Sequence, residues 1–176
     1  PVISCGSVLS VAETGPARKI ERYKTLLARH MESLYQFAQL VNVGEVPKNN
    51  ADLSAKILRP IDETTVQLPM STPEKKIKDY LDRSPHDVTV NDVVRQFTKV
   101  PYGWSDYATI YFLNELVRRH LYAFNYNNNP NVSREETARN IVRDANKFTV
   151  EKAKAISQDV LNDFIDAWKK IFNVMS

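Results

Sequence analysis

The stretch from Thr72 to Phe124 constrains the fold of this chain more than any other part. It holds three short helical patterns followed by an alternating apolar run. Thr72 suits the cap of the first helix, and Pro73 suits its first turn, where the missing N–H would be unpaired anyway. Thr89, with Asp92 three residues later, predicts the start of the second helix. Ser105 predicts the start of the third. This order predicts a helix-turn-helix with a wing.

The third helix is preceded by a tight turn at Pro101-Tyr102-Gly103-Trp104. We expect Gly103 to have a positive φ or to pack closely against a neighbouring segment, because glycine tolerates both. Tyr102 and Trp104 flank it and allow two interpretations. They could form a stacking platform for nucleic-acid bases, or they could be buried and lock the turn. The second arrangement is the more common one and is favoured.

The wing is predicted from two strand patterns, Leu121–Phe124 and Phe148–Val150, that pair with each other. Ser133, followed by Glu136, predicts a helix between these strands that runs to about Ala145. Ser157 is expected to cap a final helix, with apolar residues at Leu161, Phe164, Ile165, Trp168, Ile171 and Phe172. The fold class is therefore mainly α: a long N-terminal helix, a winged-helix-like core with a small two-stranded β-wing, and a C-terminal helix.

The first 71 residues are predicted to form a helical arm and a connector. Apolar residues at steps of three and four predict one helix of about 26 residues, Pro16–Val41, with Gly44 just after its end. Val46–Met70 is expected to be a connector with a short helix at Asp52–Leu58 and a brief strand at Thr64–Leu68. We place the domain boundary between residues 71 and 72, with the winged-helix-like domain at 72–176.

Residues 1–12 and the basic face of the predicted arm helix carry no clear functional signal. Residues 1–12 are apolar and small, and we expect a strand or a tail there; Pro1 in place of Met indicates a piece of a longer protein. The strongest basic cluster of the chain lies on the arm, and a solvated helix face is favoured over a binding site for it. This cluster consists of Arg18, Lys19, Arg22, Lys24 and Arg29.

No constellation of residues predicts an enzyme or a cofactor site. Cys5 is the only cysteine, so neither an internal disulfide nor a zinc-binding thiolate cluster can form. His30, His86 and His120 are far apart and lack ligand spacing. No Gly-x-x-x-x-Gly-Lys sequence is present to hold a phosphate. No apolar run approaches the roughly 20 residues of a membrane helix, and we expect a cytoplasmic protein.

Charge decides how strongly DNA is favoured as a partner. From Thr72 to Phe124 there are eight Lys or Arg and seven Asp or Glu, which leaves +1, and the whole chain carries +3. Phosphate attraction is the main sequence-independent term in DNA affinity, so this core supplies little of it. Asp106 opens the third helix, and no basic residue precedes Arg118 in it. A winged helix that contacts protein is at least as well supported as one that reads DNA.

The candidate contact residues follow from these two alternatives. Arg95, Lys99, Arg118 and Arg119 are the predicted phosphate contacts if double-stranded DNA is the ligand. Tyr107 and Tyr111 are the predicted aromatic contacts if the partner is a protein. We predict no catalytic, metal or cofactor residue and no small-molecule substrate.

The motifs in this order resemble a segment of the large P-loop ATPases of BREX phage-defence systems. The resemblance rests on the Thr72-Pro73 helix start, the run from Asp87 to Phe97, and the Pro-Tyr-Gly-Trp turn before an apolar helix. It continues through a charged helix, a short strand and a closing helix that ends Trp168-Lys169-Lys170-Ile171-Phe172, and it covers about residues 72–173.

The resemblance implies a non-catalytic region on the C-terminal side of the ATPase core of a multidomain protein. Because the family's phosphate-binding motif is missing here, no catalytic residue is carried over. The implied partners are other defence-system subunits, other domains of the same parent chain, or DNA. The alternative is a standalone winged-helix DNA-binding regulator, and an enzyme is the third and weakest hypothesis.

Overall fold

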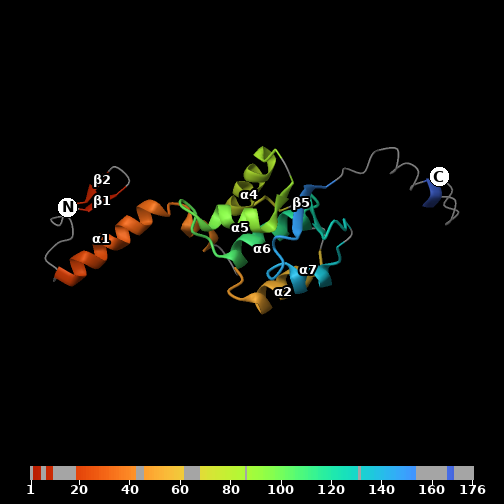
Figure 1. The fold of residues 1–176 in the computed structure, drawn as a ribbon, viewed down its shortest axis with the longest axis horizontal. Helices are drawn as coiled ribbons and strands as arrows, with labels where there is room; N and C mark the ends of the chain where they lie inside the picture. Colours follow the sequence, from red (N-terminus) through yellow and green to blue (C-terminus); the bar gives the residue numbers. More distant parts are fainter. Residues whose placement is uncertain are drawn as a thin grey trace.

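The computed structural model of the chain describes residues 2–4, 7–9, 19–42, 46–61, 68–85, 87–130, 132–153 and 166–168. Gly44, Cys5 and His86 lie outside these residues. So do nearly all of the predicted strand at Thr64–Leu68 and of the final helix from Ser157. Figure 1 shows a core built around α4, α5 and α6, with α1 extending away from it on one side.

The N-terminal elements are β1 (Val2–Ser4), β2 (Ser7–Leu9), α1 (Lys19–Leu34), the 3-10 helix η2 (Ala38–Val41) and α2 (Asn50–Leu58). The core elements are α4 (Thr72–Arg83), β3 (Val88–Thr89), α5 (Val90–Thr98), α6 (Asp106–Arg118), β4 (Tyr122–Tyr126), α7 (Arg134–Asn140) and β5 (Phe148–Lys152). The described residues are thus mainly helical, with the helix-turn-helix formed by α5 and α6.

Side-chain caps fix the starts of the core helices. Thr89 and Ser105 accept hydrogen bonds from backbone N–H groups of Asp92 and Ala108, as predicted for α5 and α6. The start of α4 differs by one residue from the prediction, because Ser71 is the cap and Thr72 is already helical. Ser71 and Glu74 bond to each other's backbone N–H groups, which satisfies two otherwise unpaired donors. Each such cap stabilises a helix by about 1 kcal/mol.

β1 and β2 pair with each other, and a separate core sheet has three antiparallel strands in the order β3-β5-β4, rather than the two predicted for the wing. The predicted pairing between β4 and β5 is confirmed, with Phe124 opposite Val150 and Tyr126 opposite Phe148. β3 adds Val88, also opposite Val150, on the other edge of β5. A strand of only two residues is too short to show an alternating pattern, so the sequence did not indicate it. The predicted helix between the wing strands is present as α7, though it is shorter than expected.

The predicted helix Pro16–Val41 does not continue as one element. Within it, α1 ends at Leu34 and η2 follows after a turn. The backbone leaves the helix because Phe37 is held by the turn before α6. Its N–H donates to the Pro101 carbonyl at 3.1 Å, and its carbonyl accepts from Trp104 Nε1 at 2.9 Å. These tertiary contacts outweigh a continuous helical pattern.

The predicted short helix at Asp52–Leu58 is confirmed as α2, and it belongs to the core. Leu53 and Ile57 are fully buried in the same apolar cluster as Ile77, Phe97 and Leu113. α2 packs on both α6 and α7, and Ser54 Oγ donates to the Ala138 carbonyl at 3.0 Å. The division of the chain at residue 72 stays a prediction, but this packing favours a domain that begins before α2.

Candidate functional site

The second helix of a helix-turn-helix is the element that enters the DNA major groove in proteins that use the motif. Here that helix is α6, and it is enclosed by other parts of the chain. α4, α5, α2 and β4 all pack against it. The buried residues of α6 are Ala108, Thr109, Ile110, Phe112, Leu113, Asn114, Glu115, Leu116 and Arg118. Only a narrow side of α6 is therefore left for an external contact.

That narrow side carries Asp106, Tyr107 and Tyr111. Asp106 is exposed, whereas Tyr107 and Tyr111 are half-buried and pack against the apolar core. The two tyrosines are one helical turn apart, so they lie on the same side of α6. Burial is the main cause that raises the pKa of the Tyr111 hydroxyl, and the nearby Glu115 carboxylate adds to it. The α6 residues of this side thus offer aromatic surface and one negative charge, while Arg59 and Lys56 of the α2 region lie near enough to oppose the rise in the pKa of Tyr111.

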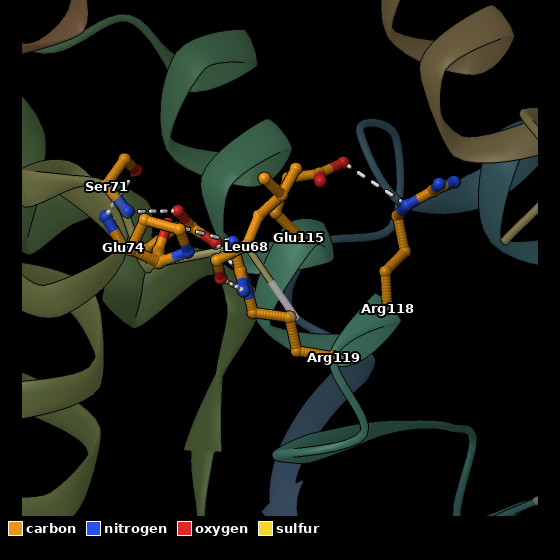
Figure 2. A network of polar contacts seen from close by, with 7 residues as sticks. Leu68, Ser71, Glu74, Glu115, Arg118 and Arg119 are labelled. Carbon is orange, nitrogen blue, oxygen red and sulfur yellow. Dashed lines mark hydrogen bonds and ion pairs between the residues drawn. The ribbon is translucent and has the colours of Figure 1, made fainter. Parts of the chain in front are cut away.

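Arg118, a predicted phosphate contact, is directed into the protein. Its side chain is 3% exposed, and its two terminal nitrogens donate to the carbonyls of Arg59 and Pro60 at 2.6 and 2.9 Å. Its Nε lies 3.4 Å from Glu115 Oε1, the ion pair drawn in Figure 2. Burial raises the pKa of Glu115, and the Arg118 guanidinium opposes that shift.

Arg119, the neighbouring predicted contact, is also occupied within the chain. Its Nε lies 2.6 Å from Glu74 Oε1, and both side chains are less than one-tenth exposed. It also donates to the Leu68 carbonyl at 2.5 Å (Figure 2). Glu74 in turn accepts the Ser71 N–H at 2.6 Å. The two arginines therefore hold the described ends of the connector, residues 59–60 and 68–69, against the end of α6.

The other two predicted phosphate contacts lie elsewhere. Arg95 and Lys99 are exposed on α5 and at its C-terminal cap. The structure thus separates the six candidate contact residues into an exposed pair on α5, a half-buried pair on α6 and a buried pair at the end of α6.

The turn before α6 packs its aromatic side chains against the arm and the core. Gly103 has a φ of +65°, as predicted. The Trp104 side chain is 1% exposed and stacks on Phe97, with ring centroids 4.7 Å apart. Tyr102 packs between Phe97 and Phe37. Trp104 is buried too deeply to stack on a nucleic-acid base. The turn instead holds the arm against the core.

A second polar cluster joins α4 to the sheet. Asp82 accepts a hydrogen bond from the Tyr122 hydroxyl at 2.9 Å and pairs with Lys152 at 2.9 Å and with Lys78. Lys78 is the first cause that holds the pKa of Asp82 well below its usual range, and Lys152 and Tyr122 add to it. The same carboxylate, together with burial, raises the pKa of Tyr122. All four groups find partners within the cluster, which is typical of a structural contact.

Among the described residues, no group of three or more His, Cys, Asp or Glu is placed to hold a metal ion. In the same part of the chain, no helix is both long and apolar enough to cross a membrane.

The family model described as "BREX ATP-binding protein BrxC winged helix-turn-helix domain" matches residues 52–158. The chain belongs to this family. The match agrees with the resemblance predicted from the Pro-Tyr-Gly-Trp turn and its surroundings. It begins within α2, at Asp52, and so includes the buried residues Leu53 and Ile57. No curated protein and no solved structure matches the chain.

The BrxC-type domain contains buried polar contacts that were not among the predicted site residues. Glu74 and Glu115 are the partners of the two arginines, and Asp82 links α4 to β4 and β5. Two signals could have found the first pair. Ser71-x-x-Glu74 is a capping-box sequence, and a glutamate with two arginines in an otherwise apolar helix indicates buried ion pairs. No local signal predicts that the connector carbonyls complete the network.

Proposed function

We propose that this chain is a non-catalytic interaction module of a larger BREX ATP-binding protein, and that it contacts protein rather than DNA. The family match supports the assignment of the parent protein as a BREX ATP-binding protein. The observation that carries the choice of partner is the enclosure of α6, because a helix buried on most sides cannot lie in a major groove. The proposed partners are other domains of the parent chain or other subunits of the same defence system.

The charges of the core point to the same choice. Two of the four predicted phosphate contacts, Arg118 and Arg119, already have carbonyl and carboxylate partners inside the chain. Detaching either guanidinium would leave a buried acid without its cation, which is strongly unfavourable. Only Arg95 and Lys99 stay exposed from that set. Half-buried tyrosines such as Tyr107 and Tyr111 suit a protein contact, since they add apolar area at small entropic cost.

Photo-crosslinking in the intact parent protein tests this proposal. A photoreactive amino acid is placed at position 107 on α6, and in a matched sample at position 99 on α5, with duplex DNA present in both. We expect position 107 to crosslink to peptide and not to DNA. A DNA crosslink from position 107 would contradict the proposal and favour the DNA-binding regulator. A DNA crosslink from position 99 alone would also contradict the proposal, because it would place a DNA contact on α5.

A further inference from the structure

α1 carries an apolar stripe that the described residues leave uncovered. The stripe consists of Ile20, Tyr23, Leu27 and Met31, whose spacings of three and four place them on one side of the helix. These side chains are 45–70% exposed. Figure 1 shows α1 extending away from the core. A row of large exposed apolar side chains on one face is typical of an interaction surface.

The stripe continues into a hollow beside the core. A pocket of about 520 Å³ is lined by Met31 and Tyr35 from the arm, by Gln39 from η2, and by Thr98 and Gly103 from the region of the turn. Met31 belongs to both the stripe and the pocket. The apolar surface thus runs along α1 and ends in a concave site where a large side chain can be buried.

The chemistry of a suitable occupant is set by charge. α1 contains four basic and two acidic residues, so an apolar helix with acidic flanks suits it. Residues 157–168 of this chain have that sequence, and Lys169 and Lys170 follow it within the segment 157–172. They repeat apolar residues at steps of three and four, and from Ser157 to Trp168 they contain three Asp and no Lys or Arg. Residues 166–168 of this segment are helical, and Trp168 is 50% exposed.

The position of the segment determines which copy it can reach. In Figure 1, α1 and β5 lie on opposite sides of the core, and the turn that contains Trp168 lies beyond β5. The segment follows Ala153, the residue after β5, and the four residues from there to Ser157 span at most about 14 Å. A contact within one chain would have to pass around the core. A contact with another chain has no such constraint.

We propose that the apolar stripe of α1 binds residues 157–172 of a second copy of this chain. Both segments are about 24 Å long as 16-residue helices. When each copy gives its segment to the other, the two contacts are equivalent and the assembly closes as a dimer. This proposal goes beyond the interaction function above and does not rest on it, because α1 lies outside the residues that match the family.

Sedimentation and tryptophan fluorescence of the full chain, over about 5–500 µM, test the proposal by mass action. The chain has two tryptophans, and Trp104 is buried already, so a concentration-dependent blue shift reports on Trp168. The test variant is Leu27→Asp in the stripe. The control is Thr25→Asp, which adds the same charge at an exposed position about 200° around α1. Trp168→Ala tests the other side of the contact.

We expect the wild-type chain to form dimers and its emission to shift with concentration. Leu27→Asp and Trp168→Ala should each weaken association by at least about tenfold, and Thr25→Asp by less than about threefold. A wild-type chain that stays monomeric with constant emission would overturn the proposal. So would a dimer that Leu27→Asp leaves intact. If Leu27→Asp instead changes the Trp168 emission of a monomer, the segment binds within its own chain and the second copy is excluded.

Discussion

At the scale of single residues, Arg118 and Arg119 show how burial changes the meaning of a basic pair. In the sequence they are two cations at the C-terminal end of the helix predicted to contact DNA. Positive charge there also interacts favourably with the helix dipole. In the fold, their guanidinium groups donate hydrogen bonds to connector carbonyls and form ion pairs with Glu115 and Glu74. Substitution of these arginines would therefore change stability, and a loss of DNA binding in such variants would not identify a DNA contact.

Arg119→Leu is predicted to destabilise the fold by about 3–5 kcal/mol, because it leaves the buried Glu74 carboxylate unpaired. Adding Glu74→Gln should recover part of the loss, since the amide carries no charge and can still accept the Ser71 N–H. Urea unfolding measures both variants. Arg95→Leu, at an exposed position, is the control and should stay within about 0.5 kcal/mol. An unfolding midpoint of Arg119→Leu equal to that of the control would show that the Arg119–Glu74 ion pair does not contribute to stability.

Gly103→Val is predicted to destabilise the fold for two separable reasons. A φ of +65° strains a β-branched residue, and a Cβ at this position would lie 2.6 Å from Cδ1 of Tyr35. We expect a loss of about 1–3 kcal/mol in denaturant unfolding. Repeating the substitution in a Tyr35→Ala chain removes the contact and leaves the backbone strain, so the loss should become smaller. An unchanged midpoint for Gly103→Val itself would mean that the turn is relaxed.

At the scale of elements, the sequence predicted what is local. The caps Thr89 and Ser105, the apolar sides of α4, α5 and α6, and the pairing of β4 with β5 follow from short-range patterns and are confirmed. The structure differs where distant segments meet. α1 ends early because Phe37 is held by the turn at residues 101–104, and β3 exists because β5 has a free edge to pair with. Neither contact has a signal in its own sequence neighbourhood.

The Asp82 cluster, which joins α4 to β4 and β5, is predicted to give the fold an acid-sensitive contribution. The native-state pKa of Asp82 is lowered, first by Lys78. A lowered native pKa stabilises the fold above the unfolded value of about 3.9, and this stabilisation is lost as the pH falls below it. Asp82→Asn should therefore show a smaller loss of stability between about pH 6 and pH 3 in urea unfolding. Asp79→Asn, on the exposed side of α4, is the control. Equal slopes for wild type and Asp82→Asn would contradict this role.

At the scale of the whole molecule, a helix-turn-helix is present, but α6, which occupies the position of the DNA-recognition helix, is buried in the core of the protein. The fold class could be predicted from the sequence because α4, α5, α6 and the wing have local patterns. The enclosure of α6 could not, because it depends on α2 and on the connector, which lie before the motif in the chain. Leu53 and Ile57 look like ordinary apolar residues of a connector helix until their position against α6 is known.

Titration of labelled duplex DNA with the full chain, at about 50 and 200 mM salt, tests the claim that this chain contacts protein rather than DNA. We predict a dissociation constant no lower than the nonspecific range of about 10⁻⁴–10⁻⁶ M. The same value is expected for duplexes of different DNA sequence. The variant Arg95→Ala/Lys99→Ala removes the exposed predicted phosphate contacts without disturbing the buried pair. Submicromolar binding that falls steeply with salt and is abolished in this variant would contradict the account and make the chain a DNA-binding winged helix.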